Sequence, residues 1–396
     1  MSSYEFIETQ GVPIKSWTIG VPVEVQATQF LLHLTRMRFV ASHIAVLPNV
    51  YCRQGVTTGA AIVTRSALIP GILQGHAGQG TIAMPLHQSA DSLPANLHEL
   101  REKLEKTLLP GDERGGVWKE KQAFCREAWN ELSASMEFAK RYDELATLDG
   151  TAYLGTLGIG ASSLFICKDK ENKLWLVIVA SAGNVGKKIG QFFIDQAKQE
   201  MQRWFINLPD DNLSYLPDTM PIFWDYLAAV EWCVRYGKKN RALLLQQTLS
   251  VLSEFIDSPS KAGDVIESIS HQITPFSDDK KLWLTRNGAV PAKLGEQAVI
   301  AGSMAGPLYV VKGLDNVDSH YSCAASAGRQ ISVEEARRRY DLEDHLRAVL
   351  GVECRRDEAM LEETPGAYKN PKFVMAAQSD LVDIQETLIP LLCVKS

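Results

Sequence analysis

Leu174-Trp-Leu-Val-Ile-Val-Ala180 is a short run of bulky and β-branched apolar residues, and it predicts a buried strand. After the glycine-containing segment Ser181–Lys188, the pattern changes to that of a helix over Ile189–Phe205. Apolar residues recur there four positions apart, which places them on one helix face: Ile189, Phe193, Ala197 and Met201. A buried strand followed at once by an amphipathic helix indicates a core built from both kinds of element.

Strand-like and helical segments are interleaved along the rest of the chain. Short apolar runs predict strands over His43–Leu47, Ala60–Val63, Ser163–Cys167, Leu282–Thr285 and Leu308–Val311. Helical periodicity predicts helices over Val21–Met37, Leu97–Leu108, Lys119–Leu145 and Phe223–Phe255, the last of them long enough for two. Ser332 and Glu335 form a capping box, which predicts a helix running toward Leu350.

This order of elements predicts an α+β fold. No internal repeat, linker or break in composition divides the chain, so we expect one large domain over residues 1–396. Its mixed β core would be surrounded by helices, and residues 190–266 would form a mostly helical excursion within it.

Composition excludes several classes of protein. With 45% hydrophobic and 22% charged residues among 396, the chain is neither disordered nor fibrous. The net charge of −6 excludes a strongly basic nucleic-acid coat. No apolar run is long enough to span a bilayer and the first residues do not resemble a signal peptide, so we expect no membrane association. Seven dispersed cysteines without a C-x-x-C pair indicate reduced thiols and a cytoplasmic protein.

Short motifs alone do not indicate a functional site. The Ser181–Lys188 segment lacks the first glycine of a phosphate-binding loop, so we interpret it as a strand-to-helix turn. Arg337-Arg338-Arg339 lies on the capped helix and is typical of a solvated face. None of the eight histidines forms an H-E-x-x-H motif or another local ligand pair.

Longer strings carry a resemblance to a known family. They include Gly11-Val-Pro-Ile-Lys-Ser-Trp17, His43-Ile-Ala-Val-Leu-Pro-Asn-Val50, Leu154-Gly-Thr-Leu-Gly-Ile-Gly160, Arg286-Asn-Gly-Ala-Val290 and Met375-Ala-Ala-Gln-Ser-Asp-Leu-Val382. In order and spacing they resemble the RtcB family of RNA-splicing ligases, over essentially the whole chain. The resemblance implies the joining of an RNA 2′,3′-cyclic phosphate or 3′-phosphate end to a 5′-hydroxyl end. It also implies GTP, two manganese ions and a histidine that becomes guanylylated.

The sequence departs from the family where this chemistry occurs. The family string S-C-S-H-G-A-G-R holds the nucleophile, and Ala325 stands at the position of its histidine. The family string V-D-I-G-C-G-M supplies an aspartate and a cysteine ligand, which here are His76 and Gln79. Two further ligand histidines are replaced by Ser162 and Val179, and Pro48-Asn49-Val50-Tyr51 replaces P-D-V-H. At nucleotide-contacting positions, Ala161 replaces an asparagine and Phe165 a glutamate.

A few positions still match the family. His271 keeps its histidine at a ligand position, and with His76 it is the candidate for a single metal ion. Ser303 and Lys395 match positions that contact the guanylate, and Lys395 would approach the guanine. GTP and manganese are expected as cofactors only if the family function is retained.

Three hypotheses follow. The first is a ligation-incompetent pseudoenzyme that binds RNA ends, a nucleotide or a protein partner such as an active relative. The second is an enzyme with rebuilt chemistry, in which His76, His271 and His320 form a new site. The third is a residual GTP- and manganese-dependent RNA ligase. Because scaffold strings persist while nucleophile and ligand positions change together, the sequence favours the pseudoenzyme.

Overall fold

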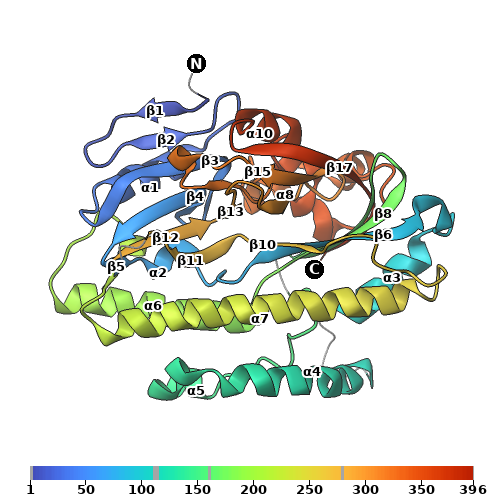
Figure 1. Cartoon of the computed structure of the whole chain (residues 1–396), viewed down its shortest axis with the longest axis horizontal. Coiled ribbons are helices and arrows are strands. Elements are labelled where there is room, and N and C mark those ends of the chain that lie inside the picture. Colours follow the sequence, from blue (N-terminus) through green and yellow to red (C-terminus); the bar gives the residue numbers. More distant parts are fainter. Residues whose placement is uncertain (1–2, 110–115, 159–161, 278–280, 396) are drawn as a thin grey trace.

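The α+β prediction is confirmed by the computed structural model, which describes residues 3–109, 116–158, 162–277 and 281–395 (Figure 1). Two large sheets form the core. The six-stranded sheet has the order β1 (Glu5–Ile7), β2 (Ile14–Ser16), β3 (Val40–Arg53), β4 (Val56–Arg65), β12 (Leu282–Asn287) and β11 (His271–Pro275). The seven-stranded sheet has the order β10 (Ile266–Ile269), β6 (Gly80–Ser89), β8 (Lys173–Ala180), β7 (Ser163–Lys168), β17 (Val382–Lys395), β15 (Leu308–Gly313) and β14 (Gln297–Ile300).

Two small two-stranded sheets complete the described strands. They pair β13 (Ala289–Pro291) with β16 (Ser322–Ala324), and β5 (Ala67–Leu68) with β9 (Leu216–Pro217). Among the pairings of named strands, β2 with β3 is parallel and the others are antiparallel. The run Leu174–Ala180 lies in β8, which pairs with β6 and β7, and its apolar residues are buried except for the partly exposed Val179.

The helices are α1 (Val25–Thr35), α2 (Pro70–Leu73), α3 (His98–Leu108), α4 (Gly116–Ala134), α5 (Asp143–Ala146), α6 (Gly183–Arg203), α7 (Pro221–Leu252), α8 (Val333–Arg339), α9 (Leu342–Ala348) and α10 (Pro371–Ala377). Short 3-10 turns are η1 (Ala90–Ser92), η2 (Glu137–Arg141), η3 (Asp211–Leu213), η4 (Val317–Ser319), η5 (Glu358–Glu363) and η6 (Pro365–Ala367). In the view of Figure 1, α6 and α7 lie beneath the sheets, with α4 and α5 beyond them. Residues 190–266 contain most of α6, all of α7 and β9. In the described part of the chain, no helix has the length and apolarity needed to cross a bilayer.

Three helix predictions were wrong in their boundaries. Phe223–Phe255 is a single helix, α7, because Gly237 is a packing contact and not a break: a Cβ there would lie 2.3 Å from the Gly78 carbonyl oxygen. The helix begun at Ser332 ends at Arg339, and Asp341 then caps α9 through the Asp344 N–H. Lys119–Leu145 divides into α4, η2 and α5. The strand-to-helix turn at Ser181–Lys188 is confirmed, since β8 ends at Ala180 and α6 begins at Gly183.

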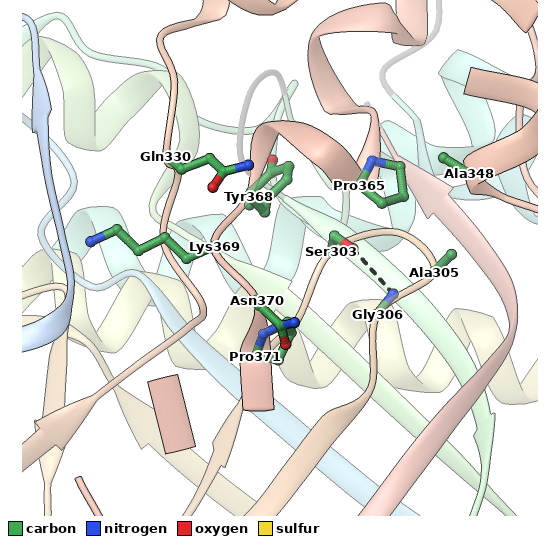
Figure 2. A pocket seen from close by; sticks show the side chains of 10 residues that line it. All are labelled: Ser303, Ala305, Gly306, Gln330, Ala348, Pro365, Tyr368, Lys369, Asn370 and Pro371. Carbon is green, nitrogen blue, oxygen red and sulfur yellow. Dashed lines mark hydrogen bonds between the residues drawn. The ribbon is translucent and has the colours of Figure 1, made fainter. Parts of the chain in front are cut away.

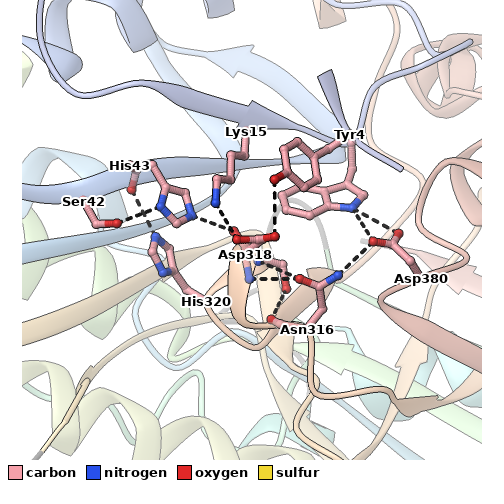
Figure 3. A network of polar contacts seen from close by, with 10 residues as sticks. Tyr4, Lys15, Ser42, His43, Asn316, Asp318, His320 and Asp380 are labelled. Atoms are coloured by element: carbon pink, nitrogen blue, oxygen red, sulfur yellow. Dashed lines mark hydrogen bonds and ion pairs between the residues drawn. The ribbon is translucent and has the colours of Figure 1, made fainter. Parts of the chain in front are cut away.

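A polar network fastens the first strands to η4 (Figure 3). The His43 and His320 rings stack with their centroids 4.2 Å apart. The His320 Nε2–H donates to the His43 carbonyl at 3.0 Å, and the His43 Nε2–H donates to the Asp318 carbonyl at 2.6 Å. Lys15 forms an ion pair with the Asp318 carboxylate. Burial, followed by the nearby charges of His43, Lys15 and Arg286, lowers the pKa of His320 to about 4.

This network predicts acid destabilisation. The unfolded chain takes up a proton on His320 near pH 6.5, whereas the folded protein does so only near pH 4. Stability is therefore fully present above pH 6.5 and falls by about 3 kcal/mol per such histidine as the pH drops toward 4, at about 1.4 kcal/mol per pKa unit. His320→Asn, which keeps a residue tolerant of the positive φ of 52° at this position, should reduce this pH dependence in urea titrations. The exposed His87→Asn serves as control, and an equal loss of pH dependence in both variants would contradict the assignment.

Candidate functional site

A cavity of about 620 Å³ is lined by residues of both large sheets. Part of its wall is a row of register partners across four neighbouring strands: Thr81 on β6, Val179 on β8, Ser163 on β7 and Lys395 on β17. Neighbouring strands are about 4.8 Å apart, so this row spans roughly 14 Å. The volume is typical of a site for a small molecule or for one end of a polymer.

The structure brings most of the sequence-predicted site residues to this one cavity. Those that line it are His76, Gln79, Phe165, Val179, His271, Ser303, Ala325 and Lys395. Ser162 is buried and does not line the cavity, whereas Ser163 does. Ala161 lies outside the described residues. His320 does not line the cavity either, because its ring stacks on His43 in the network described above, so the three-histidine site of the second hypothesis is not assembled.

Ala325 is held at the cavity by backbone hydrogen bonds. Its N–H donates to the Gly288 carbonyl at 3.1 Å, and its carbonyl accepts from the Ala301 N–H at 3.3 Å. Gly288 has φ 68°, and a Cβ there would lie 2.5 Å from the Thr58 hydroxyl, so only glycine fits this approach. The neighbouring Asn287 is the register partner of His271. The methyl group of Ala325 thus stands close to the histidine pair but offers no atom that attacks phosphorus.

The His76 and His271 rings meet edge to face, with centroids 5.9 Å apart. Two hydrogen bonds dock the loop that carries His76 onto the start of β11: the Gly78 N–H donates to the His271 carbonyl at 2.9 Å, and the His271 N–H donates to the Gln79 carbonyl at 3.3 Å. The Ser270 hydroxyl donates to the Gln79 carbonyl at 3.1 Å. The Ser270 oxygen is therefore left to accept from the His271 Nδ1–H at 2.9 Å, and the Asn287 side chain also hydrogen-bonds this imidazole.

Both imidazoles are neutral at physiological pH. Burial, followed by the positive charges of Arg53 and Lys187, lowers the pKa of His76 to about 3. Burial also lowers the pKa of His271, with smaller contributions from His76 and Arg53. No carboxylate contributes to either shift. The histidine end of the cavity is thus neutral to positive in character.

These residues do not fit a manganese pair. Two manganese ions need about five side-chain ligands with anionic charge among them. His76 and His271 supply two neutral nitrogens, the Val179 side chain supplies no ligand atom, and the Gln79 amide is a weak neutral ligand. Across the described residues, no group of three or more His, Cys, Asp or Glu side chains is arranged to hold a metal ion.

The opposite end of the cavity contains a buried charged cluster. Lys395 forms an ion pair with Glu363, and Tyr368 donates its hydroxyl hydrogen to the same carboxylate. Arg329 lies 3.5 Å from Glu363 and 5.1 Å from the Tyr368 ring centroid. Burial alone would lower the pKa of Lys395, but Tyr368 and Glu363 raise that pKa above its usual value. Lys395 is therefore charged and already partnered within the chain.

Ser303 lies between this cavity and a neighbouring one of about 340 Å³ (Figure 2). Its hydroxyl oxygen accepts from the Gly306 N–H at 3.1 Å, which closes the turn after β14. Lys369 lines the smaller cavity, but its ammonium donates to the Pro48 carbonyl at 3.0 Å and to the Val50 carbonyl. Burial lowers the pKa of Lys369 to about 8.

Sequence reasoning did not single out Arg53, Glu363 or Tyr368 as site residues. Arg53 follows the altered string at Pro48–Tyr51 by two positions, so the alteration itself was the available signal. Glu363 and Tyr368 belong to no local motif and reach the cavity only through the long-range fold.

Comparison with known proteins agrees with the resemblance seen in the sequence. The family model described as tRNA-splicing ligase RtcB matches residues 30–396. RNA-splicing ligase RtcB of Escherichia coli (strain K12) is 34% identical over 406 residues, covering 99% of this chain and 100% of that protein. RNA-splicing ligase RtcB of Mycobacterium tuberculosis is 29% identical over 251 residues, covering 57% of each chain. RNA-splicing ligase RtcB2 of Escherichia coli (strain ATCC 25922) is 22% identical over 357 residues, covering 87% of this chain and 85% of that protein.

Proposed function

This chain belongs to the RtcB family, and we propose that it is a member that has lost RNA joining and uses the inherited cavity to bind an RNA end. The main support for this proposal is the set of side chains that line the cavity around Ala325. The scaffold that presents this position is intact, but the side chain is a methyl group. The two imidazoles that line the same cavity are neutral, and no carboxylate acts on either of them.

RNA is favoured over an unrelated ligand because the cavity joins a positive end to a polar end. Arg53 and Lys187 act on the histidine end, while Lys395, Tyr368 and Ser303 lie at or near the other. Such a lining suits a phosphate at one end and a sugar or base at the other. GTP is not required for binding of this kind, and manganese would lack its ligands.

The binding half of the proposal is tested with a fluorescent oligoribonucleotide. We expect saturable binding by anisotropy without GTP or manganese, weakening steeply as salt rises because the contacts are to phosphates. The product is then resolved on a denaturing gel. Binding without joining supports the proposal. Absence of binding would contradict it and would favour a protein partner as the ligand of this surface.

Restoring the nucleophile alone should not restore joining. In Ala325→His the imidazole returns, but nothing neutralises the triphosphate or orients its α-phosphate, since Gln79, Ser162 and Val179 remain at ligand positions. Nucleophile and metal ligands act as a unit, so repair of one member recovers little. Joined product from a 3′-phosphate and 5′-hydroxyl RNA pair, measured with GTP and manganese, should stay at background.

A fuller set is the matched comparison for that variant. It combines His76→Asp, Gln79→Cys, Ser162→His, Val179→His and Ala325→His. Joining by Ala325→His alone would show that the metal-binding positions are more complete than their chemistry indicates.

We further propose that the protein works in the cytoplasm. All seven cysteines are free thiols in the structure and six of them are buried, which suits a reducing compartment. Fractionation of cells that produce the tagged protein tests this. Recovery from an oxidising compartment would contradict it.

A further inference from the structure

We infer that the His76 end of the cavity binds a phosphate monoester directly through Arg53, His76 and Gln79, without a metal ion. The inference rests on the proposed function and specifies which chemical group of the RNA end is bound. The side chains at this end supply no anionic ligand for a divalent cation, but they supply hydrogen-bond donors and positive charge.

Arg53 is fixed at its backbone and free at its head. It is the last residue of β3, and the Gln74 amide donates to its carbonyl at 3.0 Å. The preceding Cys52 N–H donates to the Glu24 carboxylate at 2.8 Å, which further fixes the hairpin. With the residues that the structure describes, the Arg53 guanidinium forms no hydrogen bond or ion pair, although it lines the cavity. A half-buried arginine without a partner among the described residues is suited to a phosphate.

The His76 ring is likewise without a hydrogen-bond partner among the described residues, and it lines the same end as Gln79. Arg53 and Lys187 both act on this ring with positive charge, which favours an anion beside it. His271 is not one of the donors, because its ring already hydrogen-bonds Ser270 and Asn287.

The test compares two oligoribonucleotides that differ only at the end, one with a 3′-phosphate and one with a 3′-hydroxyl. Both are titrated calorimetrically in EDTA against the full chain. We expect the 3′-phosphate RNA to bind about 10- to 100-fold more tightly, the range for one charge-assisted arginine contact. Arg53→Gln should abolish this preference and Arg53→Lys should keep part of it. Arg38→Gln, at an exposed arginine outside the cavity, should keep all of it.

Each outcome separates this inference from the proposed function. Equal binding of both ends, unchanged by Arg53→Gln, would overturn the phosphate site while RNA binding stands. A 3′-phosphate preference that disappears in EDTA would also overturn it. Binding of neither RNA, with Arg53-dependent binding of GMP, would retain the phosphate site and assign it to a free nucleotide, against the proposed RNA ligand.

Discussion

Phe165→Glu is expected to destabilise the protein by about 4 kcal/mol or more, although it restores the residue type that the family has at this position. The Phe165 side chain is only 3% exposed and packs in a hydrophobic cluster with Ala83, Val177 and Cys393. A carboxylate there would lose this packing and would have to stay desolvated without a partner. The free energy of unfolding from urea titrations measures the loss.

Ile389→Glu on the adjacent strand β17 is the matched control. Ile389 is 46% exposed and its strand pairs with β7, so the same substitution meets solvent and should cost less than about 1 kcal/mol. If Phe165→Glu were as mild as this control, the apolar environment assigned to Phe165 would be wrong. The obstacle to reverting the chain to a ligase would then lie elsewhere.

Arg241→Met should cost about 3–5 kcal/mol, because it leaves two buried backbone carbonyls, of Gly78 and Ala180, without their donor. The Arg241 side chain is fully buried in α7 and contacts Glu267 at 3.0 Å. Its guanidinium also donates to the Gly78 carbonyl at 2.9 Å and to the Ala180 carbonyl at 2.8 Å. Arg241 therefore ties α7 to the loop that carries His76 and Gln79, and its loss should also weaken binding of 3′-phosphate RNA.

Lys239→Met, two residues away on the same helix, is the control for Arg241. Lys239 pairs with Glu131 at 3.1 Å on the surface, where such pairs contribute at most about 1 kcal/mol. Urea titrations of the two variants should differ by more than about 2 kcal/mol. Equal stabilities would show that Arg241 does not brace the loop.

The local sequence pattern predicted which helices and strands exist better than it predicted the residues at which they begin and end. The strand at Leu174–Ala180 and the turn after it follow from short-range chemistry, which sequence reveals. Phe223–Phe255 was long enough for two helices, but α7 is one helix that ends at Leu252, and its Gly237 contacts Gly78 on a distant loop. Asp341 starts a new helix through its own cap, which the apolar periodicity did not indicate.

The candidate site was predictable only through family strings. Thr81, Val179 and Lys395 come into one row through β6, β8 and β17, which are far apart in sequence, and no periodicity predicts such a meeting. His320 carried the same residue type as His76 but belongs to a separate network with His43. Arg53 was not predicted because a lone arginine at a hairpin has no motif, and its significance depends on a guanidinium that pairs with none of the described residues.

The central claim is that this cavity binds a phosphate-bearing end without joining it, and intact-mass spectrometry with a joining assay tests this most directly. The chain is incubated with GTP, manganese and a 3′-phosphate and 5′-hydroxyl RNA pair, with RNA-splicing ligase RtcB of Escherichia coli run in parallel. We predict a protein of unchanged mass and no joined RNA, since Ala325 has no nucleophile and the pair His76 and His271 does not fit manganese. A protein heavier by one GMP, or joined RNA above background, would contradict the account.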